Sequence, residues 1–119
     1  MNKAERDIAE TAYWFRSFDR YGTESKALKA LLKRKSMVGC DVDKLASRFR
    51  AMVQLHDKTL EHSKSVLRNA KRSFHPQLTK AQFDDGTERI RNHLVQEFSD
   101  VPDSIEYMIA MLWHMPYVR

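Results

Sequence analysis

The chain has 119 residues, of which 42% are hydrophobic and 31% are charged, and its formal net charge is +5. A chain of this length builds one hydrophobic core, which excludes a multidomain enzyme, and its composition excludes a disordered or fibrous protein. Only three glycines and three prolines are present, too few for the many turns of a β-sandwich or barrel. We therefore expect an all-α fold, a single-domain bundle of about five helices over residues 1–119 with one long central helix.

The first helix is predicted from Asn2 to about Arg20. Asn2 with Glu5 three residues later has the form of a capping box, and Gly22 suits a left-handed stop after the last turn. Most apolar side chains of this segment fall on one arc of a helix, whereas Tyr13 points elsewhere and is expected to be exposed. The arc contains Ala4, Ile8, Ala12, Trp14, Phe15, Phe18 and Tyr21.

Two further helices are predicted on either side of Gly39. Thr23 can cap one that runs to about Ser36, with leucines facing inward and lysines facing outward. Asp41 can cap the next, which is free of glycine and proline until Pro76 and therefore forms the long central helix. Its apolar line contains Leu45, Phe49, Met52, His56, Leu60, Leu67, Ala70 and Phe74.

A fourth helix is predicted from Thr79 to about Val101. Thr79 and Gln82 repeat the capping-box pattern, and apolar residues follow on one face. Because glycine weakens a helix interior, we favour a kink at Gly86. The alternative is a break there, with Asp85 as the cap of a second segment.

The last helix is predicted to open at Asp100 and Pro102 and to end at Pro116. Polar residues interrupt its apolar stretch, which is shorter than the roughly 20 apolar residues that span a bilayer, so no membrane partner is expected. The chain opens without a signal-peptide pattern and holds a single cysteine, Cys40, which favours a cytoplasmic location. Ile105, Met108, Ile109 and Leu112 are expected to face the core.

The positive charge is concentrated in the middle of the chain. Residues 23–75 hold thirteen basic and five acidic side chains, a net +8, whereas residues 1–22 are neutral and residues 76–119 carry −3. Such a concentration is typical of a surface that meets phosphates. Several of these basic residues recur at helical spacing, opposite apolar faces. The predicted nucleic-acid contacts are Lys26, Lys29, Lys33, Arg50, Lys64, Arg68, Lys71 and Arg72.

A helix-turn-helix around Gly39 would be another way to bind DNA, with Arg48 and Arg50 reaching bases. It fails because Lys35 stands four residues before the glycine, where a small residue is needed, and because the following helix is too long. Contacts to the sugar-phosphate backbone are therefore favoured over base readout, with DNA or RNA left open. An ordinary solvent-exposed face is also rich in lysine, so a purely structural interpretation competes with this one.

Aromatic side chains near the two ends of the chain indicate a second function. The first and last helices hold more aromatic mass than one buried stripe on each requires, and methionines near the last helix add a pliable surface. The alternative function is a protein–protein interaction module, either a self-associating subunit or a phage-type inhibitor of a larger complex. The predicted partner-binding residues are Tyr13, Trp14, Tyr107 and Trp113.

The sequence holds no catalytic, cofactor or metal motif. Its five histidines form no i, i+4 pair and its three glycines form no phosphate loop. We predict no enzymatic activity, no cofactor and no metal, and the leading prediction is a non-enzymatic nucleic-acid-binding accessory protein or small subunit. A cluster assembled from separate helices would escape this search and would indicate a metal-dependent nuclease. It would draw on His56, His62 or His93 with Asp57, Glu61 or Glu97.

Overall fold

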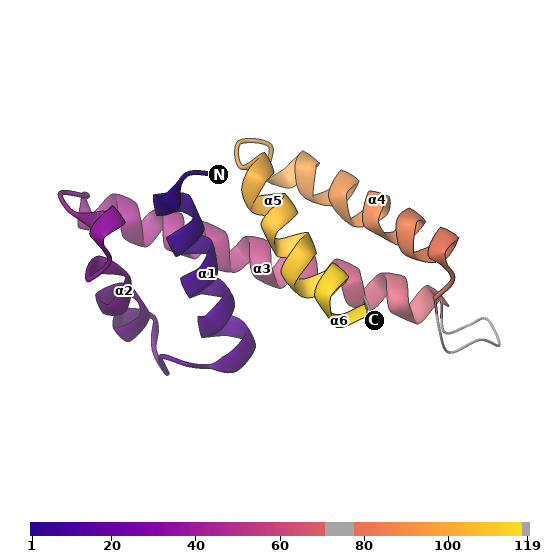
Figure 1. Cartoon of the computed structure of the whole chain (residues 1–119), viewed down its shortest axis with the longest axis horizontal. Coiled ribbons are helices and arrows are strands. Elements are labelled where there is room, and N and C mark those ends of the chain that lie inside the picture. The colour runs from indigo at the N-terminus through magenta and orange to yellow at the C-terminus, as the bar shows by residue number, and fades with distance from the viewer. Residues whose placement is uncertain (71–77, 118–119) are drawn as a thin grey trace. The chain divides into compact units, whose positions relative to one another are not determined.

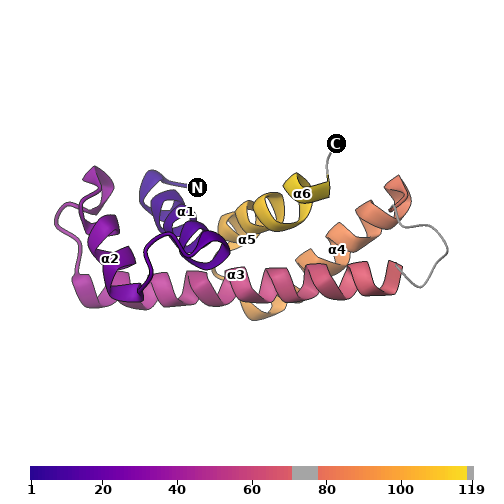
Figure 2. The same cartoon turned by 90° about the horizontal axis from the view of Figure 1, so that it is seen from below.

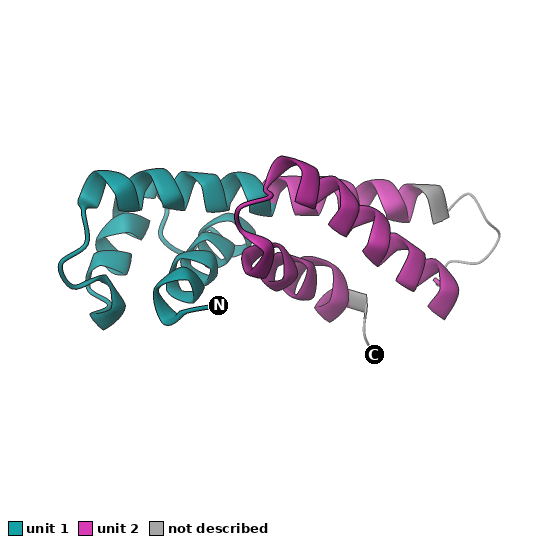
Figure 3. Cartoon of the chain, turned by 90° about the horizontal axis from the view of Figure 1, so that it is seen from above, with its two compact units in different colours: residues 1–56 teal, residues 57–119 magenta. Residues whose placement is uncertain are grey.

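The computed structural model describes residues 1–70 and 78–117, with the side chains of all of them except 69, 70 and 117. The described residues form helices and no strand, so the predicted all-α fold and its long central helix are confirmed. The chain divides into two compact units, unit 1 (residues 1–56) and unit 2 (residues 57–119) (Figure 3). That the chain is a single domain stays a prediction.

The long helix α3 is continuous and contributes residues to both units (Figure 2). Unit 1 also contains α1, α2 and η1, and unit 2 contains the remaining helices (Figure 3). Figure 1 labels the α-helices. The elements are α1 (Lys3–Phe18), α2 (Glu24–Leu32), the 3-10 helix η1 (Lys35–Met37), α3 (Val42–Ala70), α4 (Lys80–Glu97), α5 (Pro102–Ile109), the π-helix η2 (Ala110–His114) and α6 (Met115–Tyr117).

The helices of unit 1 begin where their caps predict. The side chain of Asn2 accepts a hydrogen bond from the Glu5 amide at 2.8 Å, and that of Thr23 accepts one from the Lys26 amide at 3.2 Å. The carboxylate of Asp41 accepts from two amides of the first turn of α3, at 2.9 and 3.1 Å. These side chains satisfy amides that have no partner within their helices.

The ends of α1 and α2 differ from the predictions. Helix α1 ends at Phe18 because Asp19 takes the left-handed conformation, with φ of 50°. Helix α2 ends at Leu32, so the predicted end at Ser36 is wrong. The Ser36 hydroxyl donates to the buried carboxylate of Asp7 in α1 at 2.5 Å. This contact holds the chain after Leu32 outside the helix. Instead of continuing α2, the chain forms the short 3-10 helix η1.

The core of unit 1 confirms most of the predicted apolar faces and corrects one. Phe18 was expected on the buried arc of α1, but 58% of it is exposed. Tyr13, expected to be exposed, is half-buried and its ring lies 6.2 Å from that of His56. The buried apolar residues of this unit are Ile8, Ala9, Ala12, Ala27, Leu31, Met37, Leu45, Phe49, Met52 and Leu55.

Helix α4 starts with the predicted capping box, in which Thr79 and Gln82 bond to each other's backbone amides. It then runs unbroken through Gly86, so the alternative of a break capped by Asp85 is wrong. A Cβ atom at Gly86 would lie 2.8 Å from Cγ1 of Val66 and 2.9 Å from Cζ2 of Trp113. The glycine therefore has a packing role that the predicted kink did not anticipate, because only a bare backbone fits there.

The last predicted helix is three consecutive elements. Pro102 occupies its first turn as expected, but Val101 rather than Asp100 is the N-cap. The π-helix η2 follows, and its widened turn ends where the Met115 amide donates to the Ala110 carbonyl. Pro116 lies inside α6 and does not end the helix at that position. A proline removes a helical hydrogen bond and crowds the preceding turn, and the turn that precedes Pro116 is the π-helix η2.

Unit 2 is held by polar links as well as by its core. The indole of Trp113 donates to the Thr87 hydroxyl at 2.8 Å, and Thr87 donates to the Phe83 carbonyl at 2.9 Å. Arg91 of α4 makes a two-pronged ion pair with Glu106 of α5, at 2.6 and 3.0 Å. The buried apolar residues are Ile90, Leu94, Ile105, Met108, Ile109, Leu112 and Trp113.

No helix in the described part of the chain has the length and apolar character to cross a membrane.

Candidate nucleic-acid interface

The excess positive charge belongs to unit 1. Residues 1–56 hold twelve basic and seven acidic side chains, a net +5, whereas residues 57–119 hold nine of each. The division at predicted helix boundaries had assigned the excess to residues 23–75, a segment that the two units share. A charge excess confined to one compact unit gives that unit an attraction for polyanions that the other lacks.

Three lysines on α2 and at its end form the most regular basic surface of unit 1. Lys26, Lys29 and Lys33 are exposed and recur on one face of the helix, while Ala27 and Leu31 are fully buried on the other. Within the described residues, none of these three lysines forms an ion pair. Their charges are therefore available to an external anion. We call Lys26, Lys29 and Lys33 the α2 lysines.

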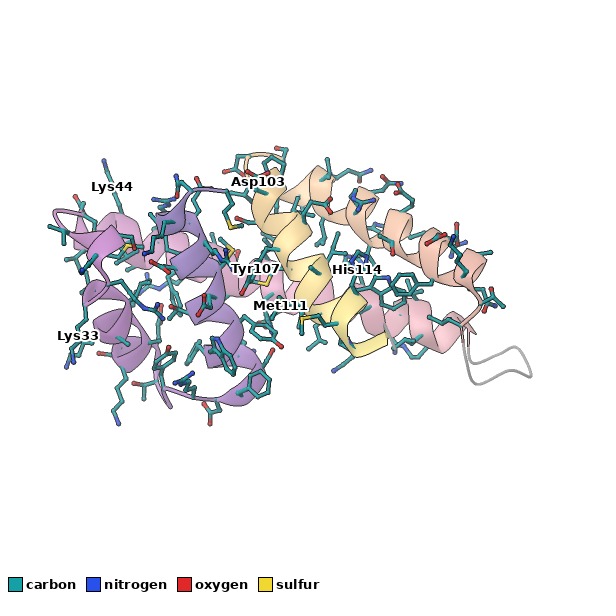
Figure 4. The ribbon with its side chains drawn as sticks, viewed as in Figure 1. Lys33, Lys44, Asp103, Tyr107, Met111 and His114 are labelled. Atoms are coloured by element: carbon teal, nitrogen blue, oxygen red, sulfur yellow. The ribbon has the colours of Figure 1, made fainter. Side chains whose placement is uncertain are left out.

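Two more lysines of unit 1 are exposed and carry no ion pair to a described residue. Lys35 lies in η1 and Lys44 lies in the first turn of α3. Figure 4 shows Lys33 and Lys44 extending away from the ribbon of this unit. Both Lys35 and Lys44 were missed as candidate contacts, because a lysine after a helix or in its first turn has no periodic pattern to mark it.

The arginines of unit 1 differ from its lysines because acidic neighbours pair with several of them. Arg50, a predicted phosphate contact, donates from Nε to Oε1 of Glu24 at 2.7 Å. Arg34 lies 3.8 Å from the carboxylate of Asp7. Glu24 offsets part of the positive charge of Arg50, so we expect this residue to be a weaker phosphate contact than the unpaired α2 lysines.

The remaining predicted contacts belong to unit 2 or lie outside the described residues. Lys64 and Arg68 are exposed on the part of α3 that belongs to unit 2. Lys71 and Arg72 lie outside the described residues. The predicted contacts thus divide between the two units, and the α2 lysines are the set that one element of one unit presents together.

The last turns of α1 carry a cluster of three aromatic rings, Tyr13, Trp14 and Phe18, which we call the aromatic cluster. The ring centroids of Trp14 and Phe18 are 4.9 Å apart, and Tyr13 meets both rings edge-on at 5.8 and 5.6 Å. The guanidinium of Arg20 lies 5.3 Å from the centre of the Trp14 ring, a cation–π contact. Tyr13 and Trp14 are half-buried, so Phe18 is the exposed member of the cluster.

A part-buried polar contact joins α1 to His56, whose ring lies near that of Tyr13. The Nε2 atom of His56 is 2.8 Å from the Ser17 hydroxyl, and only 1% of His56 is exposed. His56 therefore occupies the apolar line of α3 as predicted, with a hydroxyl partner for its ring nitrogen. We interpret this contact as the hydrogen bond that a buried imidazole requires.

The other two predicted partner-binding residues lie in unit 2. The Tyr107 side chain is half-buried on α5, and Figure 4 labels it together with Met111 of the following element, η2. Trp113 is completely buried, and its ring stacks 5.3 Å from that of Phe83. The indole of Trp113 therefore offers no exposed surface to a partner.

Two histidines that are far apart in the sequence meet in unit 2. His62 of α3 and His93 of α4 stack with ring centroids 4.7 Å apart and planes 6° from parallel. Burial and the neighbouring His93 hold the pKa of His62 below its ordinary value of 6.5. In residues 1–70 and 78–117, no group of three or more histidine, cysteine or acidic side chains is placed to hold a metal ion. His56 belongs to unit 1, whereas His62 and His93 belong to unit 2.

No family model matches the chain, and neither the curated proteins nor the solved structures contain a significant match to it.

Proposed function

We propose that the protein is a non-enzymatic nucleic-acid-binding accessory protein or small subunit, which contacts the phosphate backbone without reading sequence. The observation that carries this proposal is the set of α2 lysines, which are exposed, share one helix face and form no ion pair to a described residue. The net charge of +5 on unit 1 adds a longer-range attraction for the same ligand.

The chemistry of these side chains favours the backbone over base edges. A lysine ammonium is a flexible point charge that tolerates many phosphate positions, whereas base readout relies on planar, two-pronged donors such as arginine. Arg50 and Arg34, which have that shape, face carboxylates of their own unit. Binding through the α2 lysines is therefore expected to depend on charge and to vary little with sequence.

The test is binding to nucleic acid at low salt after replacement of Lys26, Lys29 and Lys33 by glutamine. We expect the wild-type chain to bind, and we expect the triple variant to lose most of that affinity because three phosphate contacts are removed. Glutamine keeps the length and helix propensity of these positions, so α2 should form normally. Fluorescence anisotropy with a labelled oligonucleotide measures the affinity, and circular dichroism checks the fold.

The matched control removes three basic charges from unit 2, with Lys58, Lys80 and Arg89 replaced by glutamine. This variant has the same net charge as the α2 lysine variant, so total charge does not account for a difference in affinity between the two. We expect the control to retain affinity close to that of the wild type. Equal losses in the two variants, or no binding by the wild type, would contradict the proposal.

A protein–protein interaction module is the second candidate, and exposed apolar side chains favour it. Val38, Phe18 and Met115 are 84%, 58% and 64% exposed. Such side chains are anchors that a partner protein or a second copy could bury. A concentration-dependent increase of mass in light scattering, abolished by Phe18→Ala, would support this function over nucleic-acid binding.

The expected cytoplasmic location belongs to the same proposal. Cys40, the single cysteine of the sequence, is half-buried and has no second cysteine in this chain for a disulfide. A reducing compartment suits a chain with one free thiol.

A further inference from the structure

The aromatic cluster has features of a binding surface that the α2 lysines do not explain. Ile8, Ala9 and Ala12 anchor α1 in the core of unit 1, in the turns that lead up to the cluster. Tyr13 and Trp14 are half-buried, whereas Phe18 is 58% exposed and contributes little to that core. An exposed ring that is supported by two neighbouring rings is a preformed flat surface, and few rotamers are lost when a ligand stacks on it.

One basic residue contacts this surface, and another follows it closely along the chain. Arg20 follows Phe18 by two residues and lies over Trp14. The segment after α1 leads directly into α2, so the end of α1 and the start of α2 lie at the same end of unit 1 (Figure 1). Lys26, in the first turns of α2, is therefore the α2 lysine nearest to the cluster along the chain.

Acidic residues lie on both sides of the cluster along the chain, with Glu10 one helical turn before Tyr13. Glu24, at the start of α2, is paired with Arg50 at 2.7 Å. Asp19 follows Phe18 directly and is exposed at the end of α1. A ligand with both a flat apolar part and negative charges matches a surface in which the guanidinium of Arg20 lies over Trp14, the neighbour of the exposed Phe18 ring. An unpaired nucleotide has this combination, with a base that can stack and a phosphate that can pair with the cations.

We infer that the aromatic cluster is a base-stacking site for single-stranded nucleic acid, with Phe18 as the ring that meets the base and Arg20 and Lys26 as neighbouring phosphate contacts. This inference rests on the proposed function and narrows it from nucleic acid in general to unpaired strands. Bases in a duplex are already stacked on each other and cannot lie on Phe18, whereas an unpaired base of any identity can.

The experiment compares three ligands of equal length: an oligothymidylate, an abasic strand with the same phosphates and a duplex. We expect the wild-type chain to bind the oligothymidylate about tenfold more tightly than the abasic strand, because one stacked base contributes about this factor. Phe18→Ala should remove that factor for the oligothymidylate and leave the abasic affinity unchanged. Phe18→Trp, which keeps an aromatic face, should retain it, whereas Phe18→Leu should not.

Intrinsic fluorescence provides a second readout of the same site. Of the two tryptophans, Trp113 is completely buried in unit 2 and Trp14 is part of the cluster. We expect the oligothymidylate to quench the emission of Trp14, and we expect the Trp14→Phe variant to lose this quenching while its fold, checked by circular dichroism, is retained. Quenching that persists in Trp14→Phe would place the base elsewhere and would overturn the inference.

The outcomes separate this inference from the proposed function. Equal affinities for the oligothymidylate and the abasic strand, unaffected by Phe18→Ala, would overturn the stacking site while leaving phosphate binding intact. Tighter binding of the duplex than of the single strand would overturn it in the same way. Failure of all three ligands to bind would overturn both the stacking site and the proposed function. If Phe18→Ala then changed self-association, the cluster would be assigned to a protein partner.

Discussion

Gly86 shows how one residue without a side chain positions two helices of unit 2. Its α carbon faces Val66 of α3 and Trp113 of η2, at distances where a methyl group would overlap both side chains. The sequence identified this glycine as a weak point of α4, because helix propensity is a local property. Its packing role depends on residues 20 and 27 positions away, which no local pattern connects.

We predict that Gly86→Ala lowers the free energy of unfolding by about 1–2 kcal/mol. Overpacking costs about 1–3 kcal/mol, which exceeds the gain in helix propensity of up to about 1 kcal/mol. Urea denaturation followed by circular dichroism measures the change. Asn92→Ala, at an exposed position of the same helix, is the control and should not lower stability. A Gly86→Ala variant as stable as the wild type would show that Val66 and Trp113 do not close this space.

The stacked histidines lead to a second prediction, which concerns the dependence of folding stability on pH. Burial, His93 and Lys58 lower the pKa of His62, and Glu61 and Glu97 act in the opposite direction. Because the folded pKa lies below 6.5, the unfolded chain binds more protons as the pH falls through this value. Stability contributed by neutral His62 is therefore present above pH 6.5 and is lost as the pH falls toward the folded pKa.

Thermal unfolding between pH 8 and pH 5 tests this sign. We expect the melting temperature of the wild type to fall with pH more steeply than that of His62→Gln, which has no titrating ring at this position. The range stops above the region in which Glu106 titrates, since Arg91 holds the pKa of that carboxyl below its ordinary value of 4.5. Parallel pH profiles for the two proteins would mean that the stack does not couple protonation to folding.

At the scale of the elements, helix starts were predicted better than helix ends. Asn2, Thr23, Asp41 and Thr79 all act as caps, because a capping side chain bonds to amides within three residues and leaves a local signature. The end of α2 depends instead on the contact between Ser36 and Asp7, 29 residues away. The π-helix η2 also had no signal in the sequence, since apolar spacing alone does not distinguish it from the α-helix on either side.

The capping box of α4 gives a prediction for a whole element. We expect Thr79→Ala to destabilise the protein by about 1 kcal/mol, because it removes the acceptor of the Gln82 amide at the start of the helix. Thr79→Ser keeps the hydroxyl and should recover most of this loss. Chemical denaturation measures both variants. Equal destabilisation by alanine and serine would assign the effect to the lost methyl group rather than to the cap.

For the whole molecule, the sequence predicted an excess of positive charge, but it did not predict the boundary between the two units that confines this excess to unit 1. The two units meet inside α3, at residues 56 and 57, where no glycine, proline or change of periodicity occurs. The α2 lysines were predicted because they repeat on one helix face. The pairing of Arg50 with Glu24 and the exposure of Phe18 were not, because each depends on how α1, α2 and α3 pack within unit 1.

The salt dependence of binding tests the central claim, that the α2 lysines are phosphate contacts, most directly. Each contact contributes about 0.7–0.9 to the slope of the logarithm of the binding constant against the logarithm of salt concentration. We expect replacement of Lys26, Lys29 and Lys33 by glutamine to reduce the magnitude of this slope by about 2–3, and we expect the variant with the same charges removed from unit 2 to keep the wild-type slope. An α2 lysine variant with an unchanged slope, or two variants with equally reduced slopes, would contradict the claim.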